Sequence, residues 1–219
     1  MAEPAPIRIL LADDHRIVRE GLKQVLADAP EIAVQAECTH GAEVLTEVAA
    51  AGGHLGIDLV LLDIAMPGMD GLEVLQALRQ AWPQLPVLML STYPERQFAV
   101  RCIKLGAGGY LNKGADPDDM ISAVRKVAGG GLHVTPEAAE ALARAAGAAG
   151  RGGAEALSHR EHQVFRLLTL GHSVSEIGAQ LRLAPNTVST YRARILEKTG
   201  AKNDVELALY AERHAKGAS

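Results

Sequence analysis

The sequence predicts an α/β domain followed by an all-α domain. Five short apolar runs alternate with amphipathic segments in the first 130 residues, whereas residues 154–219 show helical spacing only. The charge divides in the same way, since residues 1–130 hold 11 Lys and Arg against 17 Asp and Glu, and residues 154–219 hold 9 against 7. An acidic front and a basic back indicate two separate tasks.

The front domain is expected to hold a five-stranded parallel sheet. Short, nearly continuous apolar runs are typical of strands that are covered on both faces. Their alternation with helical segments favours right-handed crossovers. The strand order that we expect, 2-1-3-4-5, is taken from the flavodoxin-like folds that this alternation resembles. The expected strands are Ile7–Ala12, Ile32–Glu37, Leu59–Asp63, Val87–Ser91 and Gly109–Leu111.

An Ala- and Gly-rich stretch separates the two domains and predicts a linker. We place the front domain at residues 1–130, the linker at residues 131–153 and the back domain at residues 154–219. Within the linker, residues 136–146 are expected to form a short helix, and residues 147–153 a flexible joint.

The back domain is expected to be a bundle of four helices. The segments Ser158–Glu161 and Ser173–Glu176 are capping boxes, each of which opens a helix. Pro185 begins a third helix after a short turn, and Asp204 is expected to cap a fourth. Two helices joined by so tight a turn indicate a helix-turn-helix.

Polar side chains stand at the carboxyl ends of the predicted strands. Asp13 and Asp14 follow the first strand, Asp63 ends the third, Ser91 ends the fourth and Lys113 follows the fifth. Because the first and third strands are neighbours in this order, the three acids should converge. A single Asp in such a place is usually a turn or cap residue. The full set argues instead for a site.

The chemistry of that site follows from its residue types. Clustered carboxylates repel one another unless a cation compensates, and oxygen ligands alone suit Mg²⁺. A carboxylate beside Mg²⁺ can attack a phosphoryl donor, which makes Asp63 the candidate nucleophile. Lys113 and Ser91 would then screen the phosphoryl oxygens.

The third helix of the back domain is a candidate DNA-reading helix. On a helical wheel Val188, Tyr191 and Ile195 face the bundle, and short polar side chains face away, where they could enter a major groove. The alternative is a solvated bundle face. The residues expected to contact DNA are Thr187, Ser189, Thr190, Arg192, Ala193, Arg194 and Lys198. We expect the cations to contact phosphates, and Ser189, Thr190 and Ala193 to contact base edges.

Two groups of motifs carry a family resemblance. The segments LLADDH, LLDIAMPGMDG, VLMLST and GAGGYLNKG resemble, in order and spacing, the receiver domains of two-component response regulators. The segment from Leu157 to Ala211 resembles the DNA-binding domain of the NarL/FixJ (LuxR-type) class. Ala184 replaces a common capping Ser and Thr199 a common Leu, which leaves the start and end of the recognition helix open.

The resemblance implies roles for the residues of the acidic site. Asp63 would be the phosphoacceptor. Asp14, Asp63 and the backbone carbonyl of Ala65 would hold Mg²⁺, and Asp13 would act through a water. Ser91 and Lys113 would sense the phosphoryl group. Tyr110 would be an aromatic switch that turns inward on activation, and an ordinary partly buried strand Tyr is the alternative.

The resemblance also implies a function. The chain would be a cytoplasmic, phosphorylation-dependent transcription regulator, with a histidine kinase as donor, double-stranded DNA as target and no membrane partner. Enzymatic activity would be limited to Mg²⁺-dependent self-phosphorylation and slow autodephosphorylation. Operators of this kind are read by dimers on two half-sites. The last helix offers Val205, Leu207, Ala208 and Leu209 as dimer contacts, with packing inside the bundle as the alternative.

Three further expectations concern the contact with the kinase and two alternative functions. Arg16, Arg19 and Leu22 are candidate kinase contacts. A Mg²⁺-dependent phosphatase that forms an aspartyl phosphate is a rival function, but it would need a second acid where Ala65 stands, and also a cap domain. A regulator with vestigial phosphorylation is a second rival, and the complete acidic set argues against it.

Overall fold

A computed structural model describes residues 5–92, 95–147, 157–181 and 183–216. By its contacts the chain divides into two compact units, Met1–Ala149 and Gly150–Ser219, which are described separately. The joint expected at residues 147–153 lies almost wholly outside the described residues. Among the described residues, no helix is long and apolar enough to span a membrane.

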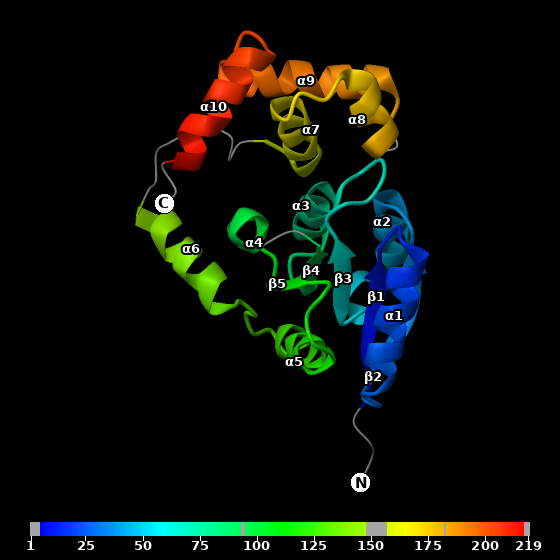
Figure 1. Cartoon of the computed structure of the whole chain (residues 1–219). Helices are drawn as coiled ribbons and strands as arrows, with labels where there is room; N and C mark the ends of the chain where they lie inside the picture. Colours follow the sequence, from blue (N-terminus) through cyan, green and yellow to red (C-terminus); the bar gives the residue numbers. More distant parts are fainter. Residues whose placement is uncertain (1–4, 93–94, 148–156, 182, 217–219) are drawn as a thin grey trace. The chain divides into compact units, whose positions relative to one another are not determined.

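The first unit contains the expected parallel sheet, with five strands in the order β2-β1-β3-β4-β5 (Figure 1). The predicted fold class is therefore confirmed. The predicted ends are confirmed to within a residue, because β2 and β5 each extend one residue further. The strands are β1 Ile7–Ala12, β2 Ile32–Cys38, β3 Leu59–Asp63, β4 Val87–Ser91 and β5 Gly109–Asn112.

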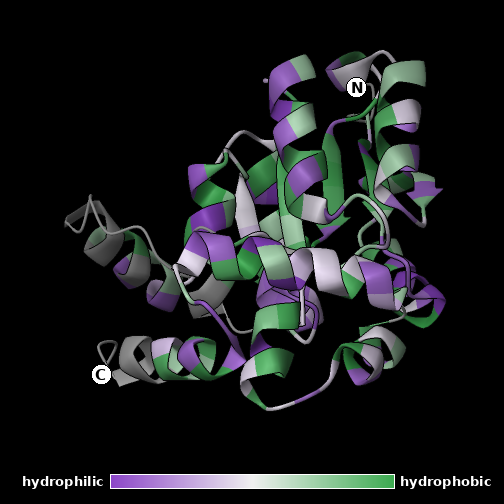
Figure 2. Cartoon of the chain, turned by 90° about the horizontal axis from the view of Figure 1, so that it is seen from above, coloured by the Kyte–Doolittle hydropathy of each residue, from purple (hydrophilic) through white to green (hydrophobic). Residues whose placement is uncertain are grey.

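Successive side chains of each strand pack on opposite faces of the sheet. Leu10 and Ala12 belong to a core shared with α2, α3 and α4, whereas Ile9 and Leu11 belong to a core shared with α1 and α5. Figure 2 shows the contrast, because the strands are mostly hydrophobic while the helices carry both kinds of residue. The helices are α1 Arg16–Ala27, α2 Gly41–Ala50, η1 Gly53–Leu55, α3 Gly71–Ala81, α4 Glu95–Lys104 and α5 Pro117–Ala128.

The segment after α5 packs along β5, at the edge of the sheet. The backbone N–H of His133 donates to the carbonyl of Gly108 at 2.9 Å, and the N–H of Tyr110 donates to the carbonyl of His133 at 3.3 Å. Helix α6, Pro136–Gly147, follows and packs against α4. Ala138 on this helix is fully buried in the core. The helix expected in the linker therefore forms, and it packs on the front domain.

We expect residues 131–147 to stabilise the front domain. A chain that ends at residue 130 loses buried Ala138, partly buried Val134 and the hydrogen bonds to β5. Burying an aliphatic side chain contributes roughly 1.5–3 kcal/mol, so the unfolding free energy of fragment 1–130 should be about 2 kcal/mol below that of fragment 1–147. Urea unfolding of both fragments measures the difference. Equal stabilities would contradict a stabilising role for this segment.

In its described residues, the second unit is a bundle of four helices, as predicted. Its core includes Val164, Ile177, Val188, Ile195 and Leu207, which are all fully buried. The two capping boxes are present, since the N–H of Glu161 donates to Ser158 Oγ at 3.2 Å and that of Glu176 to Ser173 Oγ at 3.3 Å. The helices are α7 His159–Thr169, α8 Val174–Leu181, α9 Pro185–Thr199 and α10 Asp204–Lys216.

Helix α9, the predicted recognition helix, has clear ends although Ala184 and Thr199 depart from the pattern that it resembles. Ala184 provides no side-chain cap, and Pro185 takes the first helical position. Gly200 ends the helix with a φ of 71°, a conformation that favours glycine. The predicted cap of α10 was wrong, because Asn203 Oδ1 accepts the N–H of Glu206 at 2.9 Å while Asp204 begins the helix.

Candidate functional site

The acidic residues meet at the carboxyl edge of the sheet. Ala12 of β1 pairs with Leu62 of β3, so the residues that follow, Asp13 and Asp63, come side by side. Asp13 is fully buried and Asp63 is 1% exposed. Ligand atoms of Asp13, Asp14, His15 and Asp63 all lie within 4.8 Å of one another. The expected convergence of the acids is therefore present in the fold.

Lys113 enters the same site from the end of β5. Its Nζ lies 2.5 Å from Asp13 Oδ2 and 2.9 Å from Asp63 Oδ2, and its side chain is 8% exposed. Its backbone N–H donates to the carbonyl of Ser91 at 2.8 Å, which fixes the ends of β4 and β5 together. Ser91 is buried at the end of β4. One ammonium thus faces two buried carboxylates.

The excess of negative charge in the site favours the binding of a divalent cation. Burial raises the pKa of Asp63, and the charge of Asp13 adds to this rise, while Lys113 opposes it. Among the described residues, Asp13 Oδ2, Asp14 Oδ1 and Asp63 Oδ2 have no hydrogen-bond partner, although Lys113 and His15 pair with them by charge. Three carboxylates against one ammonium form an oxygen donor set of the kind that hard cations prefer. The site could therefore bind a metal ion.

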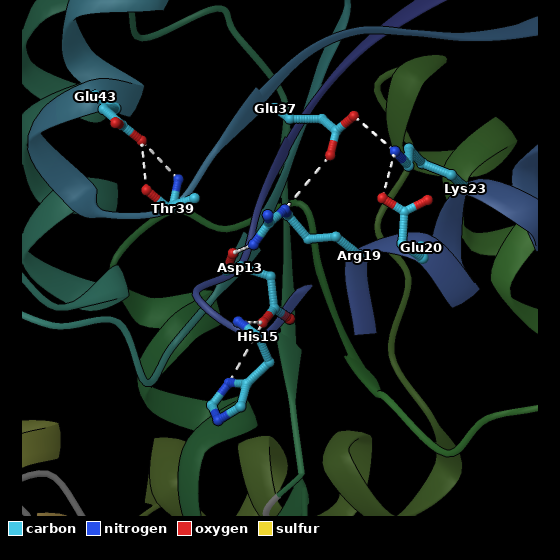
Figure 3. A network of polar contacts seen from close by, with 8 residues as sticks. All are labelled: Asp13, His15, Arg19, Glu20, Lys23, Glu37, Thr39 and Glu43. Carbon is cyan, nitrogen blue, oxygen red and sulfur yellow. Dashed lines mark hydrogen bonds and ion pairs between the residues drawn. The ribbon is translucent and has the colours of Figure 1, made fainter. Parts of the chain in front are cut away.

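His15 is a member of this site that the sequence reasoning missed. Its Nδ1 lies 2.8 Å from Asp14 Oδ1. Its backbone N–H donates to Asp13 Oδ1 at 2.8 Å (Figure 3). The tripeptide Asp13-Asp14-His15 directly after a strand was the available signal.

The loop after β3 requires a glycine at position 71. A Cβ atom at Gly71 would lie 2.1 Å from the carbonyl oxygen of Asp63, so only glycine fits there. The side chain of Asp70 then caps α3 by accepting the N–H groups of Leu72 and Glu73. Ala65 lies half-buried in this loop, and the role of its carbonyl in metal binding stays a prediction.

Tyr110 and the two cysteines are buried. Tyr110 is 1% exposed and lies in the core that the sheet shares with α3 and α4, so its side chain points inward in this structure. Its role as a switch stays a prediction. Burial raises the pKa of the Cys38 and Cys102 thiols to about 12, so both are expected to be unreactive.

The expectation for the α1 surface needs correction. Leu22 is only 6% exposed and packs in the core, so it cannot offer a kinase contact. The side chain of Arg19 is 12% exposed and is bonded to neighbouring residues. Arg16 is exposed and remains a candidate contact.

The outer face of α9 carries the expected DNA-contacting residues. Thr187, Ser189, Thr190, Ala193 and Arg194 are exposed, whereas Val188 and Ile195 are fully buried, as the helical wheel predicted. A groove of about 330 Å³ lies on this helix. The groove is lined by Asn186, Thr187, Thr190, Tyr191 and Arg194. Asn186 and Tyr191 were not among the predicted contacts.

Two of the predicted phosphate contacts have partners inside the bundle. Arg192 Nε lies 2.8 Å from Asp204 Oδ1, and Lys198 Nζ lies 2.6 Å from Glu161 Oε2. The side chain of Glu161 is only 3% exposed, so Lys198 neutralises a buried charge. The side chains of Arg192 and Lys198 are still 34% and 38% exposed, so their contact with DNA stays a prediction. Arg194 is exposed and has no ion pair among the described residues.

Only some of the predicted dimer contacts on α10 are exposed. Leu207 is fully buried in the bundle core, which corrects its assignment to a dimer surface. Val205 is 71% exposed and Leu209 is 51% exposed, while Ala208 is half-buried. Val205 and Leu209 therefore remain candidates for a dimer contact.

Comparison with known proteins agrees with both units. Residues 9–125 match the model of the response regulator receiver domain, and residues 155–211 match that of the bacterial regulatory proteins of the luxR family. The response regulator GacA of Pseudomonas aeruginosa is 36% identical over 95% of this chain and 96% of its own length. The transcriptional regulatory protein UhpA of Escherichia coli is 39% identical over 92% of this chain and 96% of its own.

A solved structure extends the likeness to the fold. The response regulator ChrA of a heme-sensing two-component system is 33% identical and has a TM-score of 0.53, covering 97% of this chain and 99% of its own. The match therefore spans both units. The chain belongs to the NarL/FixJ family of two-component response regulators, transcription regulators that join a receiver domain to a LuxR-type helix-turn-helix DNA-binding domain.

Proposed function

We propose that this regulator is switched by phosphorylation of Asp63, with a partner histidine kinase as the donor and Mg²⁺ as the cofactor. The single observation that supports this most is the buried acidic site. Asp63 lies there beside Asp13, and the ammonium of Lys113 is 2.9 Å from its Oδ2. A carboxylate held between a cation and a second acid is suited to receive a phosphoryl group.

Phosphoryl transfer begins with nucleophilic attack by Asp63. A carboxylate oxygen of Asp63 attacks phosphorus and forms a new P–O bond, while the bond from phosphorus to the donor breaks and the donor keeps its electron pair. A phosphohistidine donor leaves as imidazole, and acetyl phosphate leaves as acetate. Asp14, Asp63 and the carbonyl of Ala65 would hold Mg²⁺, with Asp13 acting through a water, and the cation would supply charge stabilisation. Lys113 then pairs with the phosphoryl oxygens, and Ser91 hydrogen-bonds them.

The output we propose is binding of a cytoplasmic dimer to double-stranded DNA through α9. Its exposed short side chains, among them Ser189, Thr190 and Ala193, allow the helix to sit deep in a major groove. One helix reads only a few base pairs, so two copies on neighbouring half-sites are required for specificity. Val205 and Leu209 would contribute to the contact between the copies.

The test is DNA binding by the full chain with and without acetyl phosphate and Mg²⁺. We expect bound sites in a genome-wide mapping experiment to gain occupancy on phosphorylation. A chain that takes up one phosphoryl group but binds the same sites equally well in both states would support the vestigial alternative. Turnover of a generic phosphate ester would support the phosphatase alternative.

We expect Arg194 and Lys198 to behave differently in a salt titration of residues 154–219. Arg194→Ala should weaken binding to specific and random duplexes alike, and flatten the salt slope by about one unit, because one phosphate contact is lost. Lys198→Ala should mainly destabilise the bundle, because Glu161 is left buried and unpaired. Arg166→Ala, which removes an exposed charge from α7, is the matched control. A salt slope unchanged by Arg194→Ala would contradict this division.

A further inference from the structure

The guanidinium of Arg19 lies beside the backbone of Asp13, one of the acids of the site (Figure 3). Its Nη1 donates to the backbone carbonyl of Asp13 at 2.7 Å, and its Nε lies 3.4 Å from Glu37 Oε2. The side chain of Arg19 is 12% exposed, whereas Arg16, one turn earlier on α1, is exposed. A cation that is so well covered, and whose shortest bond is to a carbonyl of the acid-bearing loop, is not an ordinary solvated Arg.

Arg19 supplies the last of the hydrogen bonds that hold the backbone of Asp13 in place. The backbone N–H of Asp13 donates to the carbonyl of Cys38 at 3.1 Å, and its Oδ1 accepts the N–H of His15 at 2.8 Å. The carbonyl is the remaining polar group of its backbone, and Arg19 binds it by a charge-assisted hydrogen bond. This carbonyl belongs to the peptide that joins Asp13 to Asp14. Holding it therefore fixes the peptide plane from which the Asp14 side chain starts.

The guanidinium is itself supported by neighbouring charges. Glu37 of β2 accepts Lys23 Nζ at 2.8 Å as well as the longer bond from Arg19, and Lys23 also binds Glu20 at 2.9 Å (Figure 3). Lys23 shares the partner Glu37 with Arg19, but none of its hydrogen bonds or ion pairs among the described residues reaches Asp13. The two cations can therefore be separated by experiment.

We propose that Arg19 is a positioning residue of the acidic site, which holds the Asp13–Asp14 peptide so that both carboxylates face Asp63 and the bound cation. It acts from outside the site and touches neither the metal nor the phosphoryl group. Residues that orient metal ligands typically contribute 10–100-fold to metal affinity. Because Arg19 acts on the backbone, we expect the lower end of this range. The part of the inference that concerns phosphoryl transfer rests on the proposed function.

The test is Mg²⁺ affinity of the full-length protein, measured by isothermal titration calorimetry. Arg19→Met, which keeps the length of the side chain but has no donor, should raise the Mg²⁺ Kd about tenfold. Arg19→Lys should have a smaller effect, because one ammonium cannot serve the carbonyl and Glu37 in the fixed geometry of a guanidinium. Lys23→Met is the matched control and should bind Mg²⁺ as the wild type does.

A second readout is the initial rate of labelling by acetyl phosphate. In Arg19→Met the rate should fall at limiting Mg²⁺ and return close to the wild-type rate at saturating Mg²⁺, because the nucleophile is intact. Circular dichroism and the thermal midpoint establish that the variants are folded. Should Arg19→Met not fold, Arg19→Gln, which removes the charge, takes its place with the same expected loss.

The outcomes separate the two proposals. An unchanged Mg²⁺ Kd in the folded Arg19 variant would overturn the positioning role, and so would an equal loss in Lys23→Met, because the general stability of the network would then be responsible. A wild-type protein that binds Mg²⁺ but takes no phosphoryl group would overturn the proposed function alone. Arg19 would still be judged by Mg²⁺ affinity.

Discussion

Asp63→Asn is expected to abolish phosphoryl incorporation from acetyl phosphate and Mg²⁺, whereas the wild-type chain should take up one group. Asp63 is the acid that ends a central strand, is 1% exposed and lies beside Lys113. An amide at this position has no anionic oxygen to attack phosphorus, so the loss should be complete rather than partial. Intact-mass spectrometry of the labelled protein measures the uptake.

Two controls separate loss of the acceptor from loss of the fold. Asp28→Asn removes an exposed carboxylate at the end of α1 and should leave labelling unchanged. Asp63→Asn should unfold no earlier than the wild type in EDTA, because it removes one of two neighbouring buried carboxylates that repel each other. Undiminished labelling of a folded Asp63→Asn protein would refute the assignment.

Lys113→Ala is expected to uncouple phosphorylation from DNA binding. Labelling should continue at a reduced rate, because Asp63 is intact, but the gain in DNA affinity should be lost, because the phosphoryl group has no ammonium partner. The same change leaves Asp13 and Asp63 buried without their cation. Breaking a buried ion pair in this way typically costs 3–5 kcal/mol, so the unfolding free energy in EDTA should fall by about 3 kcal/mol.

The discriminating measurement for this variant is its stability with and without Mg²⁺. It should restore part of the lost stability of Lys113→Ala, because a divalent cation offsets the same carboxylates. Lys104→Ala, which removes an exposed charge from α4, should change neither stability nor coupling. If Lys113→Ala gained DNA affinity on phosphorylation as the wild type does, Lys113 would stabilise the fold but would not couple phosphorylation to DNA binding.

The acidic site was the most predictable part of this protein. Asp13, Asp14 and Asp63 could be placed together before any coordinates, because parallel strands of known order end at one edge of the sheet. His15 was missed although it lies in the same loop, since its contact with Asp14 depends on how α1 begins. The dimer assignment of Leu207 was wrong because an apolar segment does not show which of its side chains the neighbouring helices cover.

By itself the sequence determined the strand ends to within a residue, the capping boxes and the buried face of α9. These features follow from short apolar runs, from capping motifs of fixed spacing and from the 3.6-residue period of a helix, which are all local patterns in the sequence. Only the tertiary structure decided which cations already have partners. Lys198 binds Glu161, which is 37 positions away, and Arg19 lies between Asp13 and Glu37. Such pairs depend on how helices pack against their neighbours, which no periodicity in the sequence encodes.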